Sequence, residues 1–275
     1  MYTHLQLRDS ARPPVTLSTL HKMREEGEKI ACLTCYDASF AVLLDDADVD
    51  LVLVGDSLGM VIQGHDTTVP VTIDNIIYHC KAVQRGLHRP FLVADLPFMS
   101  YPSKDIALTN SVRLMQEGGA QMIKLESGGG QIEIVHHLAS HDIAVCAHLG
   151  LKPQSVHKTG GFRVQGREKE VAERMIANAV ELQGAGADIV LLECIPPALG
   201  KTITEALEVP VIGIGAGPDT DGQILVLYDI LDITSGRKPR FVRDFMAGAG
   251  TPLNALKGYV QAVKSREYPA PEHNF

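Results

Sequence analysis

The chain alternates short apolar runs with longer stretches in which apolar and polar positions mix. The runs cover residues 29–34, 51–54, 91–94, 121–125, 143–147, 188–192 and 210–214. Short runs that are almost entirely apolar are typical of parallel strands covered on both faces. An eighth run, 224–227, has the least clear pattern of the set. The pattern therefore predicts a parallel sheet of seven or eight strands.

The stretches between the runs repeat their apolar positions every three or four residues, as one face of a helix does. Three stripes are clear, and they comprise Ile73, Ile76, Ile77, Cys80 and Val83; Leu108, Val112 and Met115; and Val171, Met175, Ala179 and Leu182. Ser103 is a candidate N-cap for the second stripe, and glycines follow all three. Repeated strand–helix units in a chain of 275 residues favour a (β/α)8 TIM barrel over an open doubly wound sheet.

No long linker or break in composition divides the chain. Residues 17–275 are therefore predicted to form a single (β/α)8 barrel domain, with residues 1–16 as an N-terminal extension. Two prolines, Pro13 and Pro14, precede a short helix expected at about 18–26. The final segment, 268–275, is rich in proline and polar residues, so we expect it to lie outside the core.

Composition excludes several classes of protein. Hydrophobic residues make up 45% of the chain and charged residues 21%, which is typical of a folded globular protein. No apolar stretch approaches the ~20 residues of a membrane-spanning helix, and no secretory leader is evident. A net charge of −8 without a block rich in Lys and Arg argues against nucleic acids and membranes as partners.

The chain has 5 cysteines, an odd number that fits reduced thiols and a cytoplasmic location. Cys32 and Cys35 form a C-x-x-C pair inside a predicted strand, without a second pair nearby. Two small packing residues are a better interpretation of this pair than a redox or zinc site.

Polar side chains stand where the predicted strands end. The carboxylates among them are Asp37, Asp56, Asp95, Glu126 and Glu193, and the other candidates are Ser57, Lys124 and His148. In a parallel barrel, the carboxyl ends of the strands meet at one rim, and ligands bind there. We therefore expect these side chains to converge on one site.

So many carboxylates in one cleft would repel one another unless a cation lay among them. Oxygen donors suit Mg²⁺, which takes one or two protein carboxylates and fills its other positions with water or substrate. A 2-oxo acid could occupy two of these positions, and the metal would stabilise its enolate while Lys124 neutralised the acid.

Each of these residues also has a structural interpretation. An Asp or Ser after a strand is often the N-cap of the next helix, which applies to Asp56 and Asp95 taken singly. Lys124 could simply pair with Glu126. Position leaves open whether Glu193 is a base or a further metal ligand. Only its place at a strand end distinguishes His148 from the other histidines.

Three segments between elements are rich in glycine. Residues 55–72 and 148–166 are long enough to be functional lids. The glycines between Gly213 and Gly217 could present backbone N–H groups to an anion, although a tight turn explains them as well. Dinucleotide binding is disfavoured because these glycines follow the seventh predicted strand rather than the first.

Eight motifs, taken together and in order, resemble the ketopantoate hydroxymethyltransferase family. They are TCYDASFA, LVGDSLGMVIQGHDTTVPVT, ADLPFMSY, MIKLE, HLGLKPQSV, GGFRVQGR, LLECIP and VIGIGAGPDTDGQILVLYD. The resemblance runs from about Leu17 to Phe275. It implies a (β/α)8 barrel related to phosphoenolpyruvate mutase and isocitrate lyase, one Mg²⁺ per subunit, and a homo-oligomer that is usually a decamer.

The resemblance also implies a reaction. A hydroxymethyl group passes from 5,10-methylenetetrahydrofolate to 3-methyl-2-oxobutanoate and gives 2-dehydropantoate, in the first committed step of pantothenate biosynthesis. The addition is aldol-type, because the enolate of the acid attacks the methylene carbon of the folate. A Mg²⁺-dependent lyase or mutase of 2-oxo acids on the same scaffold is the alternative.

The same resemblance assigns roles to individual residues. Asp56, Asp95 and Glu126 would bind the metal. Substrate contacts would fall on Asp56, Ser57, Asp95, Lys124 and His148. Glu193 would be the general base. A non-catalytic protein would have no reason to keep both a complete metal set and this base.

Overall fold

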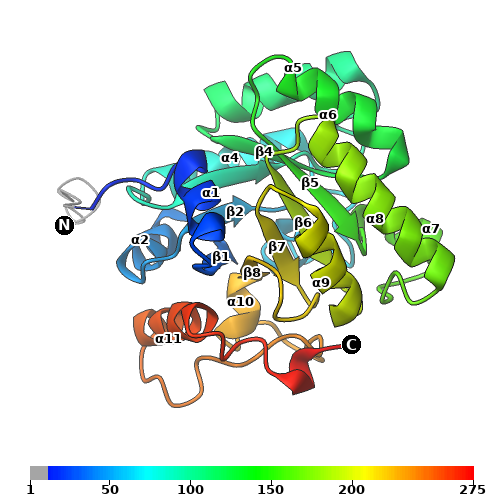
Figure 1. Cartoon of the computed structure of the whole chain (residues 1–275). Helices are drawn as coiled ribbons and strands as arrows, with labels where there is room; N and C mark the ends of the chain where they lie inside the picture. Colours follow the sequence, from blue (N-terminus) through cyan, green and yellow to red (C-terminus); the bar gives the residue numbers. More distant parts are fainter. Residues whose placement is uncertain (1–11) are drawn as a thin grey trace.

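Eight parallel strands close into a barrel in the computed structural model, which describes residues 12–275 (Figure 1). The strands are β1 (Ile30–Thr34), β2 (Leu51–Val54), β3 (Phe91–Asp95), β4 (Met122–Glu126), β5 (Val145–Gly150), β6 (Ile189–Glu193), β7 (Val211–Ile214) and β8 (Gly222–Leu225). They follow one another in chain order, and β8 pairs with β1 to close the barrel. The predicted (β/α)8 fold is confirmed.

Helices surround the strands, as Figure 1 shows for α5, α6 and α8. The helices are α1 (Leu17–Glu25), α2 (Ala38–Asp46), α3 (Leu58–Val61), α4 (Ile73–Gln84), α5 (Lys104–Gln116), α6 (Ile132–Ala139), α7 (Val156–Thr159), α8 (Lys169–Gly184), α9 (Pro197–Ala206), α10 (Leu227–Ile230) and α11 (Pro252–Lys264), with short 3-10 turns η2 (Gly129–Gln131), η3 (Pro153–Ser155) and η4 (Pro271–His273). Ser103 caps α5 as predicted, since its side chain accepts a hydrogen bond from the backbone N–H of Ile106.

The eighth strand lies slightly earlier than its apolar run, because it begins at Gly222 and α10 begins at Leu227. A Cβ atom at Gly222 would lie 2.5 Å from the carbonyl oxygen of Ile30, so glycine allows β8 to approach β1 closely. Its neighbour Gln223 is polar but buried, and its amide donates to the carbonyl oxygen of Gly217. These two residues explain why the sequence pattern was weakest here.

One apolar layer fills the barrel, and a second lies between the strands and the helices. The inner layer continues through Leu20 and Met23 of α1, so this helix packs onto the barrel interior. Val15 belongs to the same layer, and its N–H donates to the carbonyl oxygen of Arg89. Val15 of the predicted extension therefore contacts the barrel, whereas residues 1–11 lie outside the described part of the chain.

The C-terminal segment contributes to the core, so the expectation that it lies outside is wrong. Tyr268 is 2% exposed and packs edge-on against Phe245, and its hydroxyl donates to the carbonyl oxygen of Phe241. Phe275 in turn packs edge-on against Phe241. Pro269 and His273 are also buried, so burial in this segment is not confined to its aromatic rings. Figure 1 shows this end of the chain on the same side of the barrel as α10 and α11.

All five cysteines are free and buried, so the packing interpretation of Cys32 and Cys35 is confirmed. Among residues 12–275, no helix is long and apolar enough to cross a lipid bilayer.

Candidate active site

Several of the polar candidates lie near the ends of strands, in rows of side chains that point into the barrel. Successive side chains of a strand point to opposite faces, so every second residue shares a face. The rows run Phe91, Val93, Asp95 on β3; Met122, Lys124, Glu126 on β4; and Ile189, Leu191, Glu193 on β6. The apolar members of these rows fill the barrel, and the last members line its pocket. Lys124 thus stands in an apolar run because it is the middle member of an inward row.

Strand register brings these end residues together. Asp95 is the partner of Lys124 between β3 and β4, and Glu126 is the partner of His148 between β4 and β5. Gly150 is the partner of Glu193, with φ at +96°, and a Cβ atom on it would lie 2.2 Å from the carbonyl oxygen of Glu193. Glycine is therefore required where β5 passes the base candidate.

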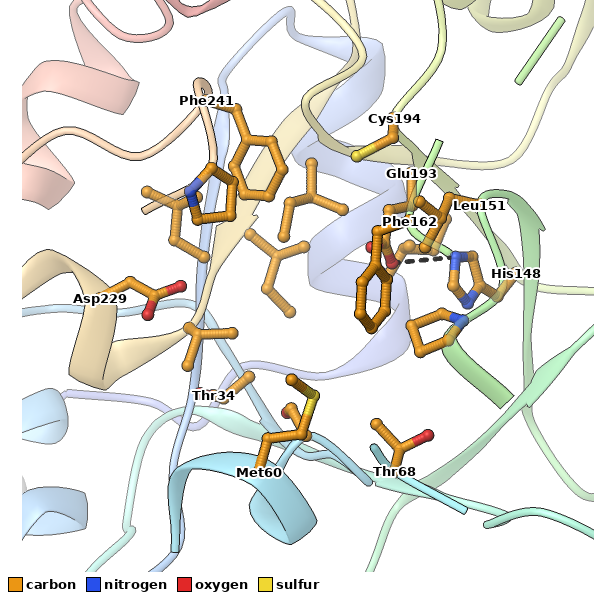
Figure 2. A pocket seen from close by; sticks show the side chains of 18 of the residues that line it. Thr34, Met60, Thr68, His148, Leu151, Phe162, Glu193, Cys194, Asp229 and Phe241 are labelled. Atoms are coloured by element: carbon orange, nitrogen blue, oxygen red, sulfur yellow. Dashed lines mark ion pairs between the residues drawn. The ribbon is translucent and has the colours of Figure 1, made fainter. Parts of the chain in front are cut away.

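A cavity of about 580 Å³ occupies this end of the barrel, and Figure 2 shows a close view of it. All seven residues to which the family resemblance gives a role line it, namely Asp56, Ser57, Asp95, Lys124, Glu126, His148 and Glu193. Asp229 and Thr34 lie across the cavity from His148, and Met60 and Thr68 lie near its lower edge in this view.

A chain of charged groups crosses the floor of the site. The ammonium of Lys124 lies 2.6 Å from Oδ1 of Asp95, and Oδ2 of Asp95 accepts a 3.0 Å hydrogen bond from the backbone N–H of Asp56. Burial alone would lower the pKa of Lys124, but Asp95, Asp56 and Glu126 together hold it above its usual value. Lys124 is therefore a permanent buried cation, and its partner is Asp95 rather than Glu126.

Two further carboxylates lie close to this pair and are short of positive charge. Burial raises the pKa of Asp56 to about 7, and the neighbouring Asp95 adds to the effect. Burial, together with Asp56, raises the pKa of Glu126 to about 8. Each of these carboxyl groups is thus poised to bind either a proton or a cation.

The donor set fits a hard divalent cation. Asp56, Asp95 and Glu126 offer oxygen atoms, which Mg²⁺ prefers, and it needs only one or two of them. Within the described residues, no group of three or more His, Cys, Asp or Glu side chains is arranged so that it could by itself hold a metal ion. The site therefore suits an ion whose remaining positions are filled by water or substrate oxygens.

Glu193 lies on the other side of the cavity with His148. Oε2 of Glu193 is 3.3 Å from Nε2 of His148, as the dashed line in Figure 2 shows. Burial raises the pKa of Glu193 to about 8, although Lys124 opposes the shift. Burial and Lys124 both push the pKa of His148 well below its usual value, so this imidazole is neutral. Glu193 is therefore a carboxyl group that can take or release a proton near neutral pH.

The structure corrects one of the carboxylates expected at the rim. Asp37 does not line the cavity, because it is the N-cap of α2 and its Oδ1 accepts a 2.9 Å hydrogen bond from the backbone N–H of Phe40. A strand end alone did not distinguish a cap from a site residue. Of the five carboxylates, four converge.

Several residues at or beside the cavity were not predicted from the sequence. They are Gln154, which hydrogen-bonds Asp56, and the cavity-lining Asp229, Arg237, Arg240 and Phe275. Asp229 follows β8, so the rule of strand ends could have found it. The last three come from the C-terminal region, whose packing over the barrel no local pattern reveals.

Both long loops reach the cavity. Met60 and Thr68 come from residues 55–72, and Phe162 and Arg163 come from residues 148–166. The glycines after β7 form a tight turn, since Gly215 and Gly217 have positive φ values of 60° and 90°. A Cβ atom at Gly217 would lie 2.7 Å from Pro197, so close packing accounts for this glycine.

Comparison with known proteins gives a family match. Residues 14–271 match the family described as ketopantoate hydroxymethyltransferase. The chain is 57% identical to the 3-methyl-2-oxobutanoate hydroxymethyltransferase of Alkalilimnicola ehrlichii, covering 96% of this chain and 95% of that protein. It is 55% identical to the enzyme of the same name from Nitrosococcus oceani, covering 95% of this chain and 99% of that protein.

Solved structures share the fold at low sequence identity. An oxaloacetate acetylhydrolase superposes with a TM-score of 0.59 at 13% identity, over 79% of this chain and 82% of that chain. A 2,3-dimethylmalate lyase of the phosphoenolpyruvate mutase/isocitrate lyase superfamily gives a TM-score of 0.56 at 15% identity, over 76% of this chain and 80% of that chain. These superpositions support the barrel fold expected from the sequence.

Proposed function

The chain belongs to the ketopantoate hydroxymethyltransferase family, and from this premise we propose how its barrel cavity carries out the family's reaction. The enzyme adds a hydroxymethyl group to 3-methyl-2-oxobutanoate and forms ketopantoate. The observation that carries the proposed mechanism is the convergence of the Lys124–Asp95 pair, two proton-poised carboxylates and Glu193 on one cavity.

One Mg²⁺ per subunit would be held by Asp56, Asp95 and Glu126. When bound, it supplies a Lewis acid that draws electron density from the keto group of the substrate. Both oxygens of Asp95 already accept hydrogen bonds, but a carboxylate oxygen has a second lone pair that remains available.

Lys124 and Ser57 bind the acid in this proposal. The buried ammonium of Lys124 offers positive charge to a carboxylate, and its Asp95 partner fixes its position. The hydroxyl of Ser57 is held by a 2.7 Å hydrogen bond with the hydroxyl of Tyr36. His148 lines the cavity beside Glu193 and keeps water from that side of the substrate.

Glu193 acts as the general base and takes the proton from C3 of the acid. Its raised pKa matches this task, because a base works best when its pKa is near the working pH. The electron pair left on C3 forms the new C–C bond with the one-carbon unit of the donor, and both C–N bonds that held this unit break. Water supplies the hydroxyl group of the product. The other proton of that water and the proton taken from C3 pass to the two donor nitrogens. Neutral His148 stays beside the carboxyl group through both protonation states.

The donor is 5,10-methylenetetrahydrofolate in this proposal, and the outer wall of the cavity fits it. Phe162, Phe241 and Phe275 offer flat apolar surfaces for a ring system. Arg163 and Arg237 line the same cavity, and both are exposed. Guanidinium groups bind carboxylates well, so they suit the acidic tail of a folate.

Proton exchange at C3 of 3-methyl-2-oxobutanoate in D₂O tests the proposal directly. We expect exchange with Mg²⁺, little exchange with the cation chelated, and a loss of about 10²–10⁴-fold in Glu193→Gln. Glu170→Gln, an exposed change on α8, is the matched control. Normal exchange by Glu193→Gln would exclude Glu193 as the base. Exchange at the same rate with and without Mg²⁺ would exclude a role for the metal in removing the proton.

The substrates are small molecules, and two broader expectations belong to the same proposal. A homodecamer is expected from the family resemblance and is open to measurement by sedimentation. A cytoplasmic location is expected from the odd cysteine number, and five free, buried thiols are consistent with it. Nucleic acids and membranes are not expected partners of a chain with a net charge of −8.

A further inference from the structure

One buried glutamine hydrogen-bonds both carboxylates that are short of positive charge. Gln154 lies in η3, within the 148–166 loop, and is 6% exposed. Its side-chain Nε2 donates a 2.9 Å hydrogen bond to Oδ2 of Asp56. Its backbone N–H donates a 2.9 Å hydrogen bond to Oε1 of Glu126. A single residue therefore links β2 and β4 through their terminal carboxylates.

Further hydrogen bonds fix the orientation of the side-chain amide of Gln154. The second hydrogen of Nε2 serves the carbonyl oxygen of Leu96, at 3.0 Å. The amide oxygen accepts a 2.7 Å hydrogen bond from the hydroxyl of Tyr101. Turning the amide over would place its oxygen against Asp56 and its N–H₂ against Tyr101. The hydrogen bonds that Nε2 donates to Asp56 and to Leu96 would then be lost.

In each of the two carboxylates, one oxygen accepts a hydrogen bond and the other does not. Across residues 12–275, Oδ2 of Asp56 and Oε1 of Glu126 accept hydrogen bonds, whereas Oδ1 of Asp56 and Oε2 of Glu126 accept none. Groups that hold a ligand's non-coordinating side set its direction and its affinity for a metal. Thus one oxygen of each carboxylate is held by Gln154, and the other remains available to bind a cation.

We propose that Gln154 is a positioning residue that presents Asp56 and Glu126 to the divalent cation and couples that site to the 148–166 loop. This inference rests on the metal site of the proposed function. The same loop carries Phe162 and Arg163 into the cavity wall. Filling the cation site therefore stabilises the loop conformation in which Gln154 reaches both carboxylates.

The side-chain chemistry makes the proposal specific. Glutamate at this position could not donate to an ionised Asp56, and asparagine would be one methylene too short for the same contacts. Methionine matches the length of glutamine but removes the donor and the acceptor. The backbone contact to Glu126 would survive in Gln154→Met, so the variant tests the side-chain contacts with Asp56, Leu96 and Tyr101.

The test is the affinity of the metal-free protein for Mg²⁺, measured by isothermal titration calorimetry with Mg²⁺ alone and again with saturating 3-methyl-2-oxobutanoate. We expect Gln154→Met to weaken Mg²⁺ binding by about 10–100-fold. Gln165→Met is the matched control, because Gln165 lies in the same loop and its amide donates to the carbonyl oxygen of Arg163 instead of a carboxylate. The Mg²⁺ affinity of this control should stay within about twofold of that of the unchanged protein. A change of that size is smaller than the effect of losing one hydrogen bond.

Tyr101→Phe gives a milder second variant, should Gln154→Met fail to fold. It removes only the hydrogen bond to the amide oxygen, so we expect a loss of about 2–10-fold in Mg²⁺ affinity. A lower melting temperature with unchanged Mg²⁺ affinity in both variants would show a merely structural role and overturn the inference. No Mg²⁺ binding by the unchanged protein would instead overturn the proposed function.

Discussion

At the scale of single residues, burial changes what an ordinary carboxyl group can do. Glu193 ends an inward row of β6, where the cavity walls exclude most of the water around it. Its pKa rises from 4.5 to about 8 because the charged form loses solvation. The same residue on a helix surface would be ionised at every physiological pH and would be a weak base.

The direction of the pH dependence follows from this shift. A base must be ionised to take a proton, so kcat/KM should rise with pH and fall as the pH drops through the pKa of Glu193. A bound cation favours the ionised form and lowers that pKa, so we expect the apparent value to lie below about 8 at saturating Mg²⁺. Neutral His148 should add no second limb in this range, because its pKa is lowered well below the usual value.

A pH profile of kcat/KM between pH 5 and 9 checks this expectation, with the holoenzyme stable throughout. A rate that rose as the pH fell would contradict the assignment of an ionised carboxylate as the base.

At the scale of elements, strand ends carry two kinds of acidic residue that the sequence does not separate. Asp37 follows β1 and caps α2, whereas Asp95 ends β3 and points into the cavity. The difference lies in where each residue stands relative to its strand and to the next helix. Asp95 shares the inward row of Val93 and Phe91, whereas Asp37 lies three residues beyond the end of β1, in the extended N-cap position directly before α2.

Asp37→Ala tests this distinction. The loss of the cap should lower the free energy of unfolding by about 1 kcal/mol. Turnover of the folded enzyme should remain unchanged, because Asp37 does not line the cavity. Urea unfolding and steady-state kinetics measure the two effects. A large fall in kcat with unchanged stability would return Asp37 to the active site.

At the scale of the whole molecule, the barrel tolerates a cluster of buried carboxylates that opposes folding when ionised. The pKa values of Asp56, Glu126 and Glu193 are raised to about 7, 8 and 8. Each group binds its proton more tightly in the folded chain than in the unfolded chain. Folding is therefore favoured at low pH, and this contribution is lost as the pH rises from the unfolded values near 4 to about 8.

The metal-free protein should accordingly have a lower melting temperature at pH 8 than at pH 6, and Mg²⁺ should raise it at pH 8. At a free concentration of 100 times Kd, binding adds about 2.7 kcal/mol to the free energy of unfolding. Calorimetric melting with and without chelator measures both effects. Glu170→Gln should melt like the unchanged protein at both pH values, since Glu170 is exposed. A melting temperature that changed neither with pH nor on addition of Mg²⁺ would contradict the charge balance described for the site.

The sequence by itself determined the repeated strand–helix units and the residues at the strand ends. Apolar runs such as 51–54 and stripes such as Ile76, Cys80 and Val83 are local patterns, and their periods follow directly from strand and helix geometry. Asp56, Asp95, Lys124, Glu126, His148 and Glu193 were found for the same reason, because parallel strands end at one rim. Their roles as ligands and base stay predictions.

Only the tertiary structure decided which polar groups meet. It paired Lys124 with Asp95 rather than Glu126, placed Gln154 between two carboxylates and brought Phe275 onto the cavity from the end of the chain. These contacts join residues far apart in sequence, so they depend on strand register and on how loops fold over the barrel. No local pattern of apolar and polar residues carries that information, because distance in space is set by the packing of the whole chain.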